Sequence, residues 1–109
     1  MTIQENPYDK EINNKVYCVY SGPCYLRGLH FYNPNVKPCF LHVFDSSLCN
    51  VDIHSSIPKR VYILKANEER DQDNLQVQFG SGICFAVSIH ERIILFPPES
   101  IQGKTLYSL

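Results

Sequence analysis

The sequence predicts an all-β protein with about seven or eight short strands. An antiparallel β-sandwich, jelly-roll-like in form, is expected, and a small barrel is the alternative that the pattern leaves open. Apolar and polar residues alternate with a period of two, as where Leu75, Val77 and Phe79 alternate with Gln76 and Gln78. β-Branched and aromatic residues gather in short runs between turn signals rich in Gly, Pro and Asn. No long window shows the apolar spacing of an amphipathic helix.

The N-terminal half supplies the first three expected strands. Residues 15–20 and 24–32 are rich in β-branched and aromatic side chains. The second run ends at Asn33-Pro34-Asn35, a turn signal in which proline presets φ and asparagine bonds its own backbone. Residues 39–44 form the next run, so 24–44 is predicted to be a hairpin.

The C-terminal half is expected to supply further short strands at 60–66, 75–79, 83–89, 93–96 and 104–107. Pro58 precedes the first of them, Gly80-Ser81-Gly82 opens the third, and Pro97-Pro98 ends the fourth. Residues 66–73 are the best candidate for a helix, but they contain almost nothing apolar. A solvated loop is therefore expected there.

The chain is expected to be a single domain, because its 109 residues suit one core between two sheets. The sandwich is predicted at 15–96. Residues 1–14 are polar, and residues 97–109 begin with two prolines and contain a glycine. Both are predicted to be extended arms that leave the domain.

Composition argues against several classes of protein. Ten Lys and Arg residues stand against eleven Asp and Glu, a formal net charge of -1, so no nucleic-acid partner is expected. No apolar run approaches the roughly 18 residues of a membrane helix, so no membrane partner is expected. Residues 1–14 also lack the apolar stretch of a secretory signal.

Cysteine usage indicates a compartment and no chemistry. The cysteines are odd in number and none has CxxC spacing: Cys18, Cys24, Cys39, Cys49 and Cys84. This pattern favours neither a disulfide framework nor a zinc site. We expect reduced packing residues, a chain folded in a reducing cytoplasm, and no cofactor or metal.

Two groups of residues could carry chemistry, and each has a structural interpretation that we favour. If the 24–44 hairpin forms, His30 and His42 could meet beside Asp45 or a cysteine, but their spacing does not match a metal site. Cys39 and His42 could form a nucleophilic pair, yet nothing beside them favours a thiolate. We therefore expect neither a metal site nor a catalytic residue, and no enzymatic activity.

Three further features also have a structural and a functional interpretation. Gly80-Ser81-Gly82 superficially resembles a phosphate-binding loop, but a β-prone run follows it, so a tight turn or bulge with positive φ is expected. The acidic segment 68–73 lacks the spacing of a calcium loop. Tyrosines in the strands could build a binding surface or could cap the rim of the core, and these alternatives stay open.

A longer pattern is more specific. Residues 21–33 read Ser-Gly-Pro-Cys-Tyr-Leu-Arg-Gly-Leu-His-Phe-Tyr-Asn, and residues 40–45 read Phe-Leu-His-Val-Phe-Asp. A proline-led strand follows at 58–64, then the strand at 75–79, and then Gly-Ser-Gly-Ile-Cys-Phe-Ala-Val-Ser at 80–88. This series resembles the small all-β virion proteins of tailed bacteriophages. The five cysteines and the many aromatic residues depart from that family's usual composition.

The resemblance implies a non-enzymatic structural protein that decorates or cements a phage capsid. Its implied partners are a major capsid protein or another virion protein and further copies of itself, as a trimer joined to the shell through the arms. It would be assembled in the host cytoplasm and located in the virion.

The alternative is a tail- or capsid-borne module that recognises a host receptor or glycan. Its binding residues would come from the loops 45–58 and 67–74, which contain Asp52, His54, Glu69, Arg70 and Asp73.

Overall fold

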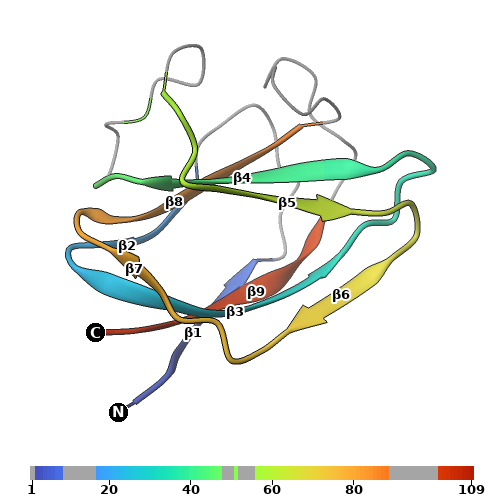
Figure 1. The fold of residues 1–109 in the computed structure, drawn as a ribbon. Helices are drawn as coiled ribbons and strands as arrows, with labels where there is room; N and C mark the ends of the chain where they lie inside the picture. Colours follow the sequence, from blue (N-terminus) through green and yellow to red (C-terminus); the bar gives the residue numbers. More distant parts are fainter. Residues whose placement is uncertain (1, 9–16, 48–50, 52–55, 89–100) are drawn as a thin grey trace.

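The computed structural model describes residues 2–8, 17–47, 51, 56–88 and 101–109. This part of the chain forms two antiparallel sheets packed face to face (Figure 1). The predicted β-sandwich is thus confirmed. No helix among the described residues is long and apolar enough to cross a membrane.

The first sheet has five strands. Its order is β1 (Gln4–Tyr8), β9 (Gln102–Ser108), β3 (Cys24–Tyr32) and β6 (Glu69–Gln72). The short strand β7 (Val77–Phe79) pairs with the beginning of β3, on the same edge where β6 pairs with its end. β3 and β9 are therefore the central strands of this sheet.

The second sheet has four strands in the order β2 (Tyr17–Ser21), β8 (Gly82–Ser88), β4 (Cys39–Asp45) and β5 (Arg60–Leu64). Every residue of β8 is buried. A strand that is covered on both faces needs an apolar residue at nearly every position, and the run Ile-Cys-Phe-Ala-Val in β8 meets that need.

The main core lies between the sheets and takes most of its residues from β2, β3, β4, β5, β7 and β8. Its buried members are Val19, Cys24, Leu26, Leu29, Phe31, Cys39, Leu41, Val43, Leu64, Phe79, Ile83, Phe85, Val87 and Ile101. Phe31 and Phe85 meet edge to face across the layers, with ring centroids 5.8 Å apart. The expected alternation at 75–79 is confirmed, because Phe79 is buried and Gln76 and Gln78 are exposed.

A second, smaller cluster lies on the outer face of the four-stranded sheet. Phe44, Cys84 and Ala86 are buried there, and Cys18 and Val51 pack against them. This face belongs to the even-numbered residues of β4 and β8, opposite to the core-facing set. The four-stranded sheet therefore buries apolar side chains on both of its faces.

The predicted hairpin at 24–44 is wrong. β3 pairs with β6, β7 and β9, whereas β4 pairs with β5 and β8, so the connection after Asn33 crosses from one sheet to the other. Asn33 is fully buried, and its side chain accepts the backbone N–H of Asn35, which is the local turn that the sequence indicated. A turn thus forms at Asn33 as expected, but it connects strands of two different sheets instead of the two strands of a hairpin.

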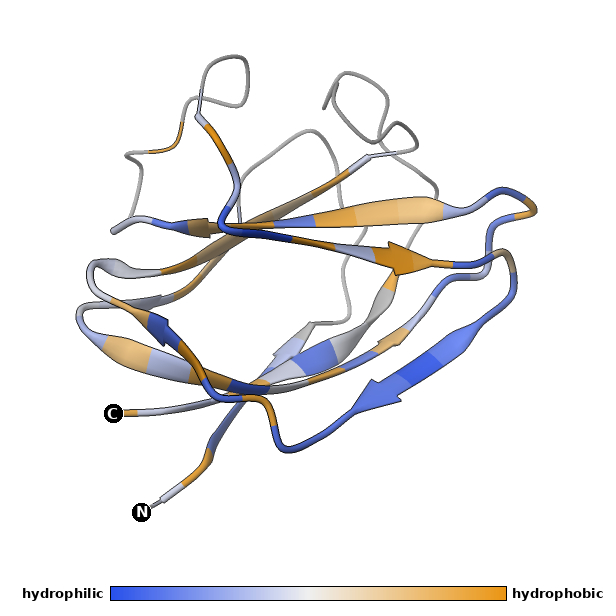
Figure 2. Cartoon of the chain, in the orientation of Figure 1, coloured by the Kyte–Doolittle hydropathy of each residue, from blue (hydrophilic) through white to orange (hydrophobic). Residues whose placement is uncertain are grey.

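The solvated loop predicted at 66–73 is also wrong in part, because Glu69–Gln72 is strand β6. The strand is hydrophilic along its length (Figure 2). Backbone pairing with β3 holds the strand in place. Arg70 also contacts the other sheet: its guanidinium lies 5.9 Å from the Tyr62 ring centroid and donates a hydrogen bond to the carbonyl oxygen of Ile63. Because this edge strand contains no apolar residue, the alternation of apolar and polar residues that predicts a strand is absent from its sequence.

The segments predicted as arms contain strands of the sandwich. β1 pairs with β9, and β9 lies between β1 and β3 inside the five-stranded sheet. Gly103 allows the close approach of β9 to β3, since a Cβ there would lie 2.1 Å from the carbonyl oxygen of His30. The expected strand at 104–107 is thus real and longer than predicted. The strand predicted at 93–96 lies outside the described residues.

Candidate functional site

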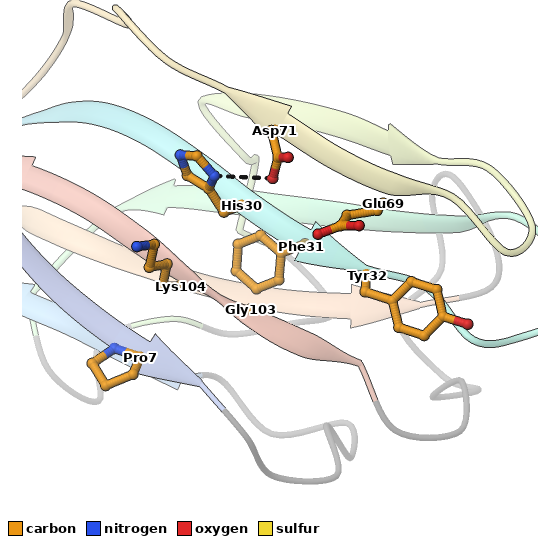
Figure 3. Close-up of a pocket in the computed structure, with 8 residues that line it drawn as sticks. All are labelled: Pro7, His30, Phe31, Tyr32, Glu69, Asp71, Gly103 and Lys104. Atoms are coloured by element: carbon orange, nitrogen blue, oxygen red, sulfur yellow. Dashed lines mark hydrogen bonds and ion pairs between the residues drawn. The ribbon is translucent and has the colours of Figure 1, made fainter.

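A shallow groove of about 480 Å³ crosses the outer face of the five-stranded sheet. Four adjacent strands contribute to it, in the order β1, β9, β3 and β6. The residues that line it are Pro7, His30, Phe31, Tyr32, Glu69, Asp71, Gly103 and Lys104. Figure 3 shows Tyr32 and Glu69 toward one end of this group, with Lys104 and Pro7 across the sheet from them.

His30 is held by two carboxylates. Its Nδ1 lies 2.9 Å from Oδ1 of Asp71 on the neighbouring strand, and its Nε2 lies 2.8 Å from Oδ1 of Asp73. Both ring nitrogens of His30 are thus engaged by carboxylates. The two contacts hold the ring in place as one wall of the groove.

The remaining charges of the groove are arranged differently. Lys104 Nζ donates to Oε1 of Glu5 at 3.0 Å, which joins β9 to β1. Glu69 has no side-chain hydrogen bond or ion pair among the described residues, and its strand pairs it with Tyr32. Tyr32 is 41% exposed. One end of the groove thus offers an aromatic ring beside a carboxylate that no described side chain pairs with.

The structure separates His30 from His42. His30 lies on the outer face of the five-stranded sheet, whereas His42 is buried in β4 of the other sheet, with Nε2 2.9 Å from Ser88 Oγ. Among the described residues, no group of three or more His, Cys, Asp or Glu side chains could hold a metal ion. The other two histidines, His54 and His90, lie outside the described part of the chain.

Cys39 and His42 do not form a nucleophilic pair. Cys39 belongs to the core between the sheets, whereas His42 shares the opposite face of β4 with Phe44. Burial raises the pKa of the Cys39 thiol to about 11, partly offset by hydrogen bonds from Asn35 and Asn33. This thiol therefore stays protonated at neutral pH.

Gly80-Ser81-Gly82 is a turn, as expected, and Gly82 has a φ of 148°. It also binds an anion, which is the chain's own Asp45 carboxylate. The backbone N–H groups of Gly80 and Ser81 donate to the two oxygens at 3.1 and 2.8 Å, and Lys59 Nζ lies 3.8 Å away. Partial burial acts to raise the pKa of Asp45, but these contacts outweigh it and hold the pKa below its ordinary value.

The tyrosines divide between the two roles left open by the sequence, the rim of the core and an exposed surface. Four are partly buried and pack against the core: Tyr17, Tyr20, Tyr62 and Tyr107. Tyr32 is exposed and lines the groove.

Of the residues expected on binding loops, Glu69 and Arg70 lie in β6, and Asp73 holds His30. Asp52 and His54 are outside the described residues.

Sequence reasoning missed Pro7, Asp71 and Lys104 as members of one site. They are far apart in the chain, and only the strand order β1-β9-β3-β6 brings them to one face. Comparison of the chain with known protein families, curated proteins and solved structures finds no match.

Proposed function

We propose that this protein is a non-enzymatic binding module whose ligand occupies the groove on the outer face of the five-stranded sheet. The observation that carries the proposal is the convergence of four strands on one groove, which combines an exposed ring, a lysine and a carboxylate with no partner among the described residues. Because these groups lie on paired strands, the sheet holds them in fixed positions before a ligand binds, which favours specific binding of one ligand shape.

The groove is suited to a neutral glycan. Carboxylates such as Glu69 and Asp71 accept hydrogen bonds from hydroxyl groups, and Lys104 can donate to ring or hydroxyl oxygens. The face of Tyr32 offers an apolar platform for a sugar ring. The excess of carboxylates around the groove disfavours an anionic ligand.

The capsid-decorating or cement protein that the sequence resemblance implies stays a prediction, but attachment through a free C-terminal arm does not fit the pairing of the sheet. β9 is an interior strand of the sheet, so residues 102–108 already contact β1 and β3. The position of the module on a bacteriophage virion, bound to a major capsid or other virion protein and assembled as a trimer, stays a prediction from the sequence resemblance. Quantitative mass spectrometry of particles that contain the chain, measuring its ratio to the major coat protein, tests that prediction.

The binding proposal is tested by titrating ¹⁵N-labelled protein with a panel of neutral oligosaccharides and following the amide signals by NMR. We expect a responding glycan to shift signals of His30, Tyr32, Glu69 and Lys104 together. Tyr32→Ala and Glu69→Gln should each weaken binding about tenfold or more, which corresponds to about 1.4 kcal/mol.

Tyr25→Ala is the matched control, because Tyr25 lies on the same strand and is not among the residues that line the groove. It should leave the affinity unchanged. Shifts that cluster away from the groove, or no shift with any glycan at millimolar concentration, would contradict the proposal.

A further inference from the structure

Two cysteines face each other across strands β2 and β8. Cys18 and Cys84 are direct Cα partners in the antiparallel register, and their Sγ atoms lie 3.3 Å apart. Directly opposed residues of antiparallel strands have Cα atoms about 4.5–5.5 Å apart. That separation lies within the roughly 4.4–6.8 Å that disulfides span. We propose that Cys18 and Cys84 form a redox modification site, where a small disulfide oxidant converts the two thiols of the folded protein into a cross-strand disulfide.

The burial of the two cysteines determines which thiol reacts with the oxidant first. Cys84 is completely buried, and its Sγ also lies 3.3 Å from the carbonyl oxygen of Ser46. Cys18 is only half-buried, on a strand at the edge of its sheet. An oxidant therefore reaches Cys18 first, and Cys84 is the resolving thiol beneath it.

The other described cysteines differ from this pair. Cys24 and Cys39 are buried in the core, on strands of opposite sheets. Burial raises the pKa of each thiol to about 11, aided at Cys24 by the negative charge of Asp45. Protonated thiols are poor nucleophiles, so oxidation is directed to the pair at 18 and 84.

The chemistry is two successive thiol–disulfide exchanges. The Cys18 thiolate attacks one sulfur of oxidised glutathione, which forms a mixed disulfide and releases one glutathione thiolate. Cys84 then loses its proton and attacks Cys18 Sγ, which forms the protein disulfide and releases the second glutathione. The two cysteines lose two electrons and two protons in all, and the oxidant is reduced to two thiols.

The disulfide would join an edge strand to the centre of its sheet. β2 pairs with β8 in the order β2-β8-β4-β5, and the two cysteines are 66 positions apart in the chain. A cross-link that closes so long a loop restricts the unfolded chain more than the folded one. We expect the melting temperature to rise by on the order of 10 °C, and reductant to reverse the change.

The experiment treats the folded protein with oxidised glutathione in a Cys49→Ser background, because Cys49 lies outside the described residues. Intact mass should fall by the two hydrogens lost, and thermal melts should be recorded with and without reductant. One tryptic peptide, residues 16–27, contains both Cys18 and Cys24, so variants must assign the bond. Cys18→Ser should abolish both the mass loss and the rise in melting temperature, whereas Cys24→Ala should retain both.

Cys18→Ser is preferred to a change at Cys84, because the half-buried edge position tolerates substitution better than the buried one. Its melting temperature under reducing conditions verifies that it folds. The proposal is overturned if the folded protein loses no hydrogens under conditions that oxidise the urea-unfolded protein. It is also overturned if the bond that forms persists in the Cys18→Ser variant.

Discussion

Asn33 is expected to be among the most sensitive polar residues of this protein. Its side chain is completely buried, and Nδ2 lies 3.0 Å from the carbonyl oxygen of Lys37 and 3.1 Å from those of Leu64 and Lys65. Its Oδ1 accepts from the backbone N–H of Asn35 at 2.9 Å. One amide thus joins the crossover between the sheets to the end of β5.

Asn33→Asp preserves the shape and the acceptor but replaces the amide donor with a carboxylate that faces carbonyl oxygens. Each buried carbonyl that loses its donor costs about 1–3 kcal/mol. Since the amide has two hydrogens, we expect a loss of roughly 2–6 kcal/mol, a large part of a total stability of about 5–15 kcal/mol. Asn33→Ala should cost somewhat less, because it adds no charge.

Urea unfolding followed by far-ultraviolet circular dichroism measures these losses. Asn74→Asp is the matched control: Asn74 is exposed with a φ of 63°, a conformation that aspartate also tolerates. That variant should remain within about 0.5 kcal/mol of the parent. An Asn33→Asp variant as stable as the Asn74→Asp variant would show that the three carbonyls do not depend on this donor.

Three further predictions follow from the sheets and the titrating groups. Truncation before residue 102 removes a central strand, so the shortened chain should show no cooperative thermal transition. The folded pKa values of Cys24 and Cys39 are raised to about 11 from 9.0. The unfolded chain therefore loses these protons first, and the melting temperature should fall as pH rises from 9 to 11, less steeply in Cys24→Ala. The folded pKa of Asp45 is lowered, so its stabilisation is present at neutral pH and lost as pH falls through that pKa. Melting curves between pH 2 and 6 should show a shallower acid limb for Asp45→Asn.

The strands that sequence reasoning located share a strong local signal. β3, β4 and β8 are rich in β-branched and aromatic residues, and β7 alternates cleanly. β6 had no such signal because Glu69–Gln72 is held by backbone pairing and by Arg70 rather than by apolar burial. A local sequence pattern predicts a strand when the strand buries apolar side chains. It does not predict a strand that is held only by pairing with its neighbours.

Pairing between strands was harder to predict than the strands themselves. A short connection between β3 and β4 resembles a hairpin loop, and the fully buried amide of Asn33 is what distinguishes a crossover. The groove was missed for the same reason. His30, Asp71 and Lys104 become neighbours only through the strand order, which no local sequence feature encodes.

The position of β9 between β1 and β3 also governs when the protein can fold. Of the described strands, β1 comes earliest in the chain, whereas its partner β9 comes last. During synthesis, β1 and the adjacent edge of β3 must therefore wait unpaired until residues 102–108 have left the ribosome. Sheets closed by such distant segments fold slowly, typically in milliseconds to seconds, and the waiting strand edges are exposed to misassociation meanwhile.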